Sequence, residues 1–365
     1  MAIRIQLRKD HPNVWDSADP TLAAGEFGFA WDSADSASFG RLKIGDGSTS
    51  WTNLPYFYSA GDSAGNYASA GGAAGIAWGG DRGLFLGGSI LGTGYVNNVE
   101  YIDINSPGNA TDFGDMDTAK GWVSAVSDTS RIVYAGGNAG SGRLNYIGYF
   151  TSSTAGNATS FGNLVTAAMP GQGFSDGTYG VFGTQGSSPR NNMQYVTIQT
   201  TSNSSNFGTL SVDRENSGGC SDGTYGYIAG GSTGSNSNII DYVTIATPSN
   251  ATDFGDLITS GNQQRSVSDE TYGVTKCGVY QSTLEYYTLG TPGNASDFGD
   301  ISTTSYAHGA FSNSTYGIFA GGYSNSTGES NIIDQITIQT PGTASDVGDL
   351  TTTRQAMGGA SGSPS

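Results

Sequence analysis

Histidine and cysteine, which often carry metal or nucleophilic chemistry, are rare in this sequence. The two histidines, His11 and His308, fall in regions of different character, so neither a histidine-based triad nor a histidine metal cluster is expected. The two cysteines, Cys220 and Cys277, cannot form a disulfide framework. We expect both thiols to be free and partly buried, and we expect no bound metal and no cofactor.

Carboxylates are more numerous and recur with the motif Asp-Phe-Gly-Asp, as at Asp253 and Asp256. Two such side chains can bind a hard cation such as calcium. Two other copies of the motif replace the acids by Ser160 and Asn163, and by Asn206 and Thr209. We therefore favour the interpretation that these acids cap turns. We interpret the neighbouring Asn-x-Ser/Thr triplets as turn caps too. These triplets begin at Asn109, Asn157, Asn250 and Asn294.

Hydrolysis of a glycan needs an acid and a base whose surroundings push their pKa values apart. The acids of this chain recur as repeat features, mostly at expected turns, where water keeps a pKa ordinary. The stretch Ser-Asp-Gly-Thr-Tyr-Gly at 175–180 resembles a sialidase turn, but no arginine recurs at one place in the repeats. We predict no catalytic residues; a polysaccharide depolymerase is the enzymatic alternative.

Composition supports a folded chain. The 365 residues include 58 glycines, 11% aromatic residues and 12% charged residues, with a net charge of −17. Such an aromatic content is not typical of disordered proteins. No apolar run is long enough to span a membrane. The negative charge disfavours nucleic acid and anionic membranes as partners.

Three sequence markers repeat six times in the same phase. An aromatic residue or valine recurs at Phe113, Phe161, Phe207, Phe254, Phe298 and Val347, at spacings of 48, 46, 47, 44 and 49. A glycine doublet begins at Gly87, Gly136, Gly183, Gly230 and Gly321, with Cys277 in the remaining copy. An acidic-Tyr segment is centred on Tyr101, Tyr146, Tyr195, Tyr242, Tyr286 and Gln335.

Each repeat has the pattern of short strands, with an Asp-Gly turn signal at Asp222-Gly223 and no helical periodicity. Repeats of this length and type indicate propeller blades. We predict an all-β protein: a small β-rich module at 1–57, a Gly/Ala/Ser linker at 58–77 and a six-bladed β-propeller at 78–365. The Phe should wedge between blades, and the glycine after it should adopt a positive φ in a turn.

The order of these markers resembles the kelch family, with the doublet Gly230-Gly231, the pair Asp241-Tyr242 and Phe254 in the place of a tryptophan. The missing tryptophan makes this a divergent, kelch-like propeller, whose ligands do not transfer. The sequence at the C-terminus repeats the segment that precedes the glycine-doublet strand in each repeat. We therefore expect residues 352–361 to complete the first blade beside Leu84–Gly88, with 73–78 as the competing segment.

Recognition is expected in the loops that follow each doublet, because they vary most in length and sequence. Tyrosine and arginine are enriched at binding hot spots. The candidate binding residues are Tyr95, Arg190, Tyr280 and Tyr323.

Residues 1–57 resemble the N-terminal attachment module of tailed-phage fibre and baseplate proteins of the major tropism determinant type. The matching parts are Ile3–Arg8, a Trp, Leu22–Gly28, Arg41–Gly47 and Trp51–Tyr56, with an insertion at 31–40. The expected attachment residues are Arg4, Arg8, Trp15, Glu26, Asp46, Trp51 and Tyr56. Glu26 can pair with Arg8 or Arg41.

The resemblance implies a virion structural protein, made in the host cytoplasm, that forms a tail fibre or tail-tip appendage. Its implied partners are other virion proteins of the tail, baseplate or capsid, a host surface receptor or glycan, and further copies of itself, three by resemblance. A head decoration protein without a receptor is the alternative.

Overall fold

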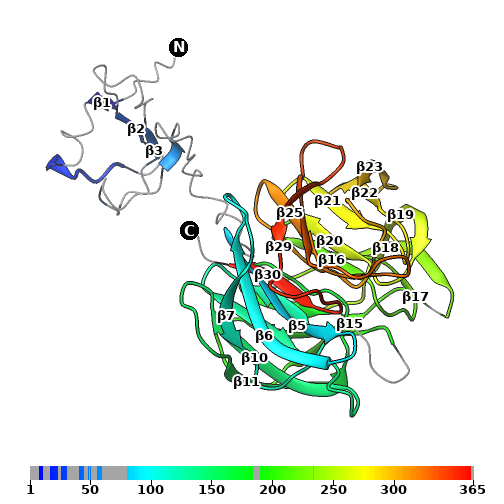
Figure 1. Ribbon diagram of the computed structural model, residues 1–365. Helices are drawn as coiled ribbons and strands as arrows, with labels where there is room; N and C mark the ends of the chain where they lie inside the picture. Colours follow the sequence, from blue (N-terminus) through cyan, green and yellow to red (C-terminus); the bar gives the residue numbers. More distant parts are fainter. Residues whose placement is uncertain are drawn as a thin grey trace. The chain divides into compact units, whose positions relative to one another are not determined.

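The computed structural model describes residues 8–10, 17–23, 26–30, 41–44, 48, 50, 56–59, 80–183, 190–232 and 234–362. The chain divides into two compact units, Met1–Gly75 and Ile76–Ser365. Each unit is described here by itself (Figure 1).

The first unit contains a four-stranded sheet in chain order. β1 (Arg8–Asp10) pairs in parallel with β2 (Phe27–Ala30), which is antiparallel to β3 (Arg41–Ile44), which in turn pairs with β4 (Tyr56–Ser59). β4 includes the first two residues of the segment expected as a linker; 60–79 lie outside the described residues.

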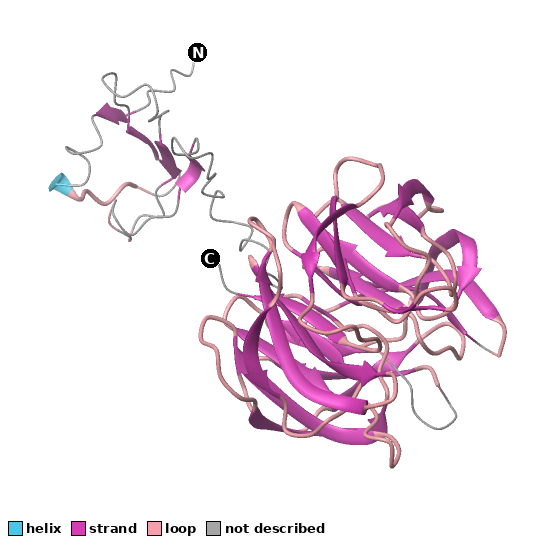
Figure 2. Ribbon diagram, viewed as in Figure 1, coloured by secondary structure: helices cyan, strands magenta, loops and turns pink. Residues whose placement is uncertain are grey.

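The second unit is a six-bladed propeller, as predicted. Its described residues between Gly80 and Gly362 form strands, turns and loops without a helix (Figure 2). Each blade is a four-stranded antiparallel sheet.

The first three blades contain β5 to β15 together with the C-terminal strand β30. Blade 1 consists of β30 (Gly358–Gly362), β5 (Arg82–Ile90), β6 (Gly94–Asp103) and β7 (Thr111–Asp115). Blade 2 consists of β8 (Ser124–Ser127), β9 (Arg131–Ala135), β10 (Leu144–Thr151) and β11 (Thr159–Ala168). Blade 3 consists of β12 (Phe174–Ser175), β13 (Tyr179–Phe182), β14 (Asn192–Thr197) and β15 (Ser205–Thr209).

The other three blades complete the ring. Blade 4 consists of β16 (Gly218–Ser221), β17 (Tyr225–Ser232), β18 (Asn236–Thr244) and β19 (Thr252–Gly261). Blade 5 consists of β20 (Arg265–Ser268), β21 (Tyr272–Lys276), β22 (Thr283–Thr288) and β23 (Ser296–Asp300). Blade 6 consists of β24 (Gly309–Ser312), β25 (Tyr316–Ala320), β28 (Ile332–Thr337) and β29 (Ser345–Asp349), and carries a ribbon of β26 (Tyr323–Ser324) and β27 (Gly328–Glu329).

The C-terminal strand closes the ring, which confirms the prediction for residues 352–361. β30 is antiparallel to β5, with Gly358 opposite Leu86 and Gly362 opposite Arg82. In Figure 1 the red C-terminal strand lies beside the cyan strands of blade 1. The competing segment, 73–78, lies outside the described residues.

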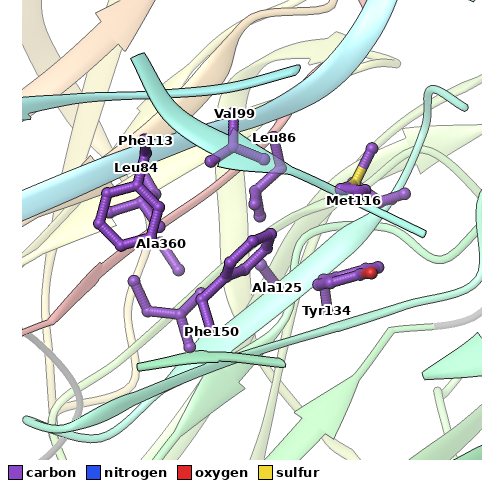
Figure 3. Packing of buried hydrophobic residues seen from close by; sticks show 11 residues of the cluster. Leu84, Leu86, Val99, Phe113, Met116, Ala125, Tyr134, Phe150 and Ala360 are labelled. Atoms are coloured by element: carbon purple, nitrogen blue, oxygen red, sulfur yellow. The ribbon is translucent and has the colours of Figure 1, made fainter. Parts of the chain in front are cut away.

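Apolar side chains of neighbouring blades share each core. Between blades 1 and 2, Phe113 is 2% exposed and its ring centroid lies 5.8 Å from that of Phe150 (Figure 3). Leu84 and Leu86 from β5 and Ala125 from β8 belong to the same cluster. The repeated Phe therefore packs between blades, as predicted, and stabilises the ring by removing apolar area from water.

The glycine after this Phe has a different role from the expected turn. Gly255 lies within β19 beside a register shift against β18, with φ +155°. A Cβ there would lie 2.2 Å from the carbonyl oxygen of Gly293 in the next blade. Glycine is required because the backbones of two blades approach too closely for a side chain.

The asparagine side chains of the Asn-x-Ser/Thr triplets accept hydrogen bonds from strand amides of a neighbouring blade, whereas they were expected to cap turns. Asn250 Oδ1 accepts a bond of 3.1 Å from the amide of Thr209 in the preceding blade. Asp256, expected as a cap, has its own amide capped by Asn294 Oδ1 at 3.0 Å. Equivalent bonds join Asn157 to Asp115, Asn203 to Asn163 and Asn109 to Asp349.

Six serines, one per inner strand, form a ring at the propeller axis. Each of five hydroxyls donates a hydrogen bond of 2.5–2.8 Å to the carbonyl oxygen of the serine in the preceding blade. The serines are Ser127, Ser175, Ser221, Ser268, Ser312 and Ser361, all buried. The six inner strands line a cavity of about 50 Å³.

Candidate functional site

One side of the ring carries the loops in which recognition was predicted. On this side, which we call the rim face, each inner strand begins and the second strand reaches its glycine doublet. The residue after the doublet forms an isolated β-bridge with the segment that leads into the inner strand of the same blade. Four such bridges are described: Ser89 with Gln355, Gly121 with Asn138, Glu215 with Ser232, and Tyr306 with Tyr323.

Three tyrosines gather at the junction of blades 5 and 6 on the rim face; we call them the tyrosine cluster. The ring centroids of Tyr280 and Tyr306 are 5.3 Å apart with an interplanar angle of 89°. Those of Tyr306 and Tyr323 are 5.7 Å apart at 62°. Both pairs pack edge to face, which is favourable for aromatic rings. Tyr306 and Tyr323 also form one of the four β-bridges described above, and it is the one that joins two aromatic residues.

Tyr280 presents its ring to solvent. It is 50% exposed, and its backbone has φ +64°, a left-handed conformation that is uncommon for a bulky residue. Backbone strain of this kind persists only where the surrounding structure imposes it, and it is concentrated at functional sites. Tyr306 and Tyr323 are half-buried and support the exposed ring.

A buried lysine connects the segments that carry the tyrosines. Lys276 Nζ donates hydrogen bonds to the carbonyl oxygens of Gly278, at 2.7 Å, and Ser305. Gly278 precedes Tyr280 by two residues, and Ser305 immediately precedes Tyr306. At the position of Lys276, just before the doublet, the other repeats carry the apolar residues Leu86, Ala135, Phe182, Ala229 and Ala320.

His308 supports the same place from blade 6. Its Nε2 lies 2.8 Å from Ser305 Oγ, and the side chain is 2% exposed. A Cβ on Gly322, next to Tyr323, would lie 3.0 Å from the imidazole. The Nε of Arg265 donates to the carbonyl oxygen of His308 at 2.9 Å. These contacts give His308 a supporting, structural role beneath the tyrosine cluster.

Burial shifts the pKa values of Lys276, His308 and Tyr306. Desolvation lowers the pKa of Lys276 to about 7 and, together with the charges of Lys276 and Arg265, the pKa of His308 well below its usual value. The pKa of Tyr306 is raised to about 12 by desolvation and by its hydrogen bond with Tyr280. The hydroxyl of Tyr306 is therefore protonated at neutral pH.

Two of the four predicted loop residues, Tyr280 and Tyr323, thus meet in one cluster, while Tyr95 and Arg190 lie elsewhere. Tyr95 packs over the backbone of Gly121, whose Cβ would lie 3.0 Å from its ring. Arg190 is paired with Glu215 across 3.3 Å.

The attachment residues are described in part. Glu26 Oε2 accepts a hydrogen bond of 2.9 Å from the amide of Ala23, next to the fully buried Leu22. Arg8 and Tyr56 lie in β1 and β4, and their side chains are outside the described part, as is that of Arg41. Arg4, Trp15, Asp46 and Trp51 also lie outside the described residues.

The acids of the acidic-Tyr segments are not in water, contrary to the sequence-based expectation. Glu100, Asp241, Glu285 and Asp334 are at most 3% exposed. Each accepts hydrogen bonds from backbone amides of the segment that leaves the outer strand of a neighbouring blade, as Asp241 does from Ser211 at 3.0 Å. Their side chains are therefore engaged in joining blades.

Two of these acids form ion pairs with buried arginines. Asp241 lies 3.1 Å from Arg214, and Glu100 lies 3.1 Å from Arg354. Asp334 accepts a hydrogen bond of 2.9 Å from the hydroxyl of Ser302, and desolvation raises its pKa.

Comparisons of the whole chain with protein-family models and with curated proteins found no match. The described residues contain no group of three or more His, Cys, Asp or Glu side chains arranged to hold a metal ion. Within the same part of the chain, no helix has the length and apolar character needed to cross a membrane. Cys220 and Cys277 are free, as predicted, and both are buried.

Tyr306 and Lys276 are the members of the site that sequence reasoning missed. The signal for both is a departure from the repeat. Lys276 stands where the other blades have an apolar residue, and Tyr306 stands where the other bridged blades have Gln355, Gly121 or Glu215.

Proposed function

We propose that this chain is a recognition protein of a tailed-phage particle, in which residues 1–57 attach to the virion and the propeller binds the host surface. The observation that carries the recognition role is the tyrosine cluster. It combines an exposed aromatic ring, a strained backbone and departures from the repeat on the face that holds the variable loops.

The virion location rests on the resemblance of residues 1–57 to phage attachment modules. The proposed partners are tail or baseplate proteins and further copies of this chain. A module of this size buries little surface and is marginal when isolated, so docking or self-association would stabilise it.

A binding role without catalysis agrees with the contacts of the acids. The buried carboxylates of Glu100, Asp241, Glu285 and Asp334 accept backbone hydrogen bonds between blades. We therefore expect purified protein to release no new reducing ends from host polysaccharide. Release that disappears after replacement of a single Asp or Glu would favour a depolymerase instead.

The proposal is tested on particles and cells. Labelled full-length protein should bind host cells, and electron microscopy of particles carrying the tagged chain should place it on the tail. Particles grown with a chain that lacks residues 1–57 should contain none of the propeller. A location on the head with no binding to cells would replace this proposal by a decoration role.

A further inference from the structure

We infer that the tyrosine cluster is a binding site for a neutral saccharide, whose pyranose ring stacks on the exposed face of Tyr280. This inference rests on the proposed recognition function and names the ligand class. It follows from the packing of the three rings, the exposed area and the charge around them.

The spacing of the rings determines what can bind. Centroid separations of 5.3 and 5.7 Å mean that the rings contact one another edge to face. No ammonium group fits between rings so close together, so the cluster is not an aromatic cage for a quaternary amine. The available surface is that of Tyr280, a residue that is 50% exposed.

A flat aromatic face with hydroxyl groups at its edge matches the two kinds of surface of a pyranose. The C–H groups on one side of the sugar carry partial positive charge and contact the electron-rich face of the ring. The sugar hydroxyls then lie within reach of the tyrosine hydroxyls and of the Gly-, Ser- and Asn-rich loop backbone around them. The hydroxyl of Tyr306 is hydrogen-bonded to Tyr280, which holds the two rings together at the edge of this surface.

Charge favours a neutral sugar over an acidic one. The chain carries a net charge of −17. Glu329 lies opposite Tyr323 in the β26–β27 ribbon and adds an acidic residue to that loop. Its carboxylate is held by the amide of Leu91 at 2.8 Å and by Gln355 at 3.2 Å. The ammonium of Lys276 is buried and bonded to backbone carbonyls, so it is not presented to a ligand.

The size of the cluster favours a saccharide over a protein partner. A stable protein interface buries about 800 Å² on each side. Apart from Tyr280, the exposed large apolar side chains of the described residues are Leu91, Val165, Val212 and Ile258. Leu91 follows β5 of blade 1, Val165 lies in β11 of blade 2, Val212 lies between β15 and β16, and Ile258 lies in β19 of blade 4. They therefore do not add to the tyrosine cluster as one broad apolar surface.

The test is binding of the full-length chain to an array of immobilised oligosaccharides. The array holds neutral hexose and N-acetylhexosamine oligomers, and oligomers that contain uronic or sialic acid. We expect binding to neutral members only. Tyr280→Asn should weaken that binding at least tenfold while leaving the fold intact, because asparagine tolerates a positive φ. Tyr280→Phe retains the stacking face and should keep most of the binding.

Ile258→Ala is the matched control, because it removes a comparably exposed apolar side chain from a different place. Binding of acidic oligomers, absence of binding to every neutral member, or unchanged binding by Tyr280→Asn would overturn the inference. Full-length protein that binds cells but fails these tests refutes the saccharide site alone. Protein that binds no host cells refutes the recognition function itself.

Discussion

The ammonium of Lys276 in blade 5 donates a hydrogen bond to the carbonyl oxygen of Ser305, which leads into blade 6. This contact links two blades beneath the tyrosine cluster, and a second bond to Gly278 fixes the segment that carries Tyr280. A titratable group thus links the segments that carry Tyr280 and Tyr306.

The first prediction concerns pH. The pKa of Lys276 is about 7 in the folded protein, whereas an unfolded lysine keeps its value near 10.5. Between these values the unfolded chain binds more protons, so the free energy of unfolding should rise as pH increases from 7 to 9. Lys276→Met should lack this part of the rise. Urea unfolding of both proteins at pH 6, 7.5 and 9 measures it, and parallel profiles would contradict the assignment.

A second prediction concerns the serine ring. Ser268→Ala removes the donor to the carbonyl oxygen of Ser221 and leaves that buried acceptor unpaired. An unpaired buried polar group costs about 1–3 kcal/mol. We expect a loss of that size in the free energy of urea unfolding. Ser249→Ala, at an exposed serine, is the control and should change stability little; equal effects of the two substitutions would argue against the ring.

Close approach between blades gives a third prediction. In Gly255→Ala the new methyl group would meet the carbonyl oxygen of Gly293 at 2.2 Å, so one backbone must move. We expect destabilisation of about 2–4 kcal/mol. Gly156→Ala is the matched control, because nothing lies within 4 Å of its Cβ position. Melting temperatures of both variants close to that of the wild type would contradict this prediction, because they would show that the two backbones move apart at little cost.

Closure of the ring gives the fourth prediction. Removal of residues 356–365 deletes β30, exposes the edge of β5 and takes Ala360 from the core between blades 1 and 2. The melting temperature should fall by more than about 10 °C, the shift expected for a loss of several kcal/mol. Removal of 363–365 alone should have little effect. A melting curve unchanged by the longer deletion would mean that another segment completes blade 1.

The propeller was predictable from the sequence because every blade repeats the same physical solution. In blades 1 to 5 a Phe packs against the neighbouring blade, so each copy of this Phe in the sequence marks one blade. The positions are 113, 161, 207, 254 and 298. The end of the chain repeats the pattern of an inner strand, which predicts its pairing with β5.

The candidate site was predictable only in part, because its members come from different segments. Tyr280 and Tyr323 follow doublets, where variable loops were expected, but Tyr306 comes from the other side of the bridge. The role of Lys276 depends on carbonyl oxygens that only the folded backbone brings together. The burial of Glu100 and Asp241 likewise depends on arginines from distant parts of the chain.

The described hydrogen bonds of the serine ring run in one rotational sense, from each hydroxyl to the blade before it in the chain. In each of these bonds a side-chain hydroxyl donates to a backbone carbonyl oxygen, and this arrangement is the same at each described junction. It also makes every junction head-to-tail, with one donor and one acceptor per repeat. Duplication of a repeat therefore leaves no unmatched partner at the axis. The hydrogen bonds of the serine ring could therefore form in a propeller with any number of blades. The angle between neighbouring blades, which is set by the packing of Phe and glycine, must decide that the ring closes at six.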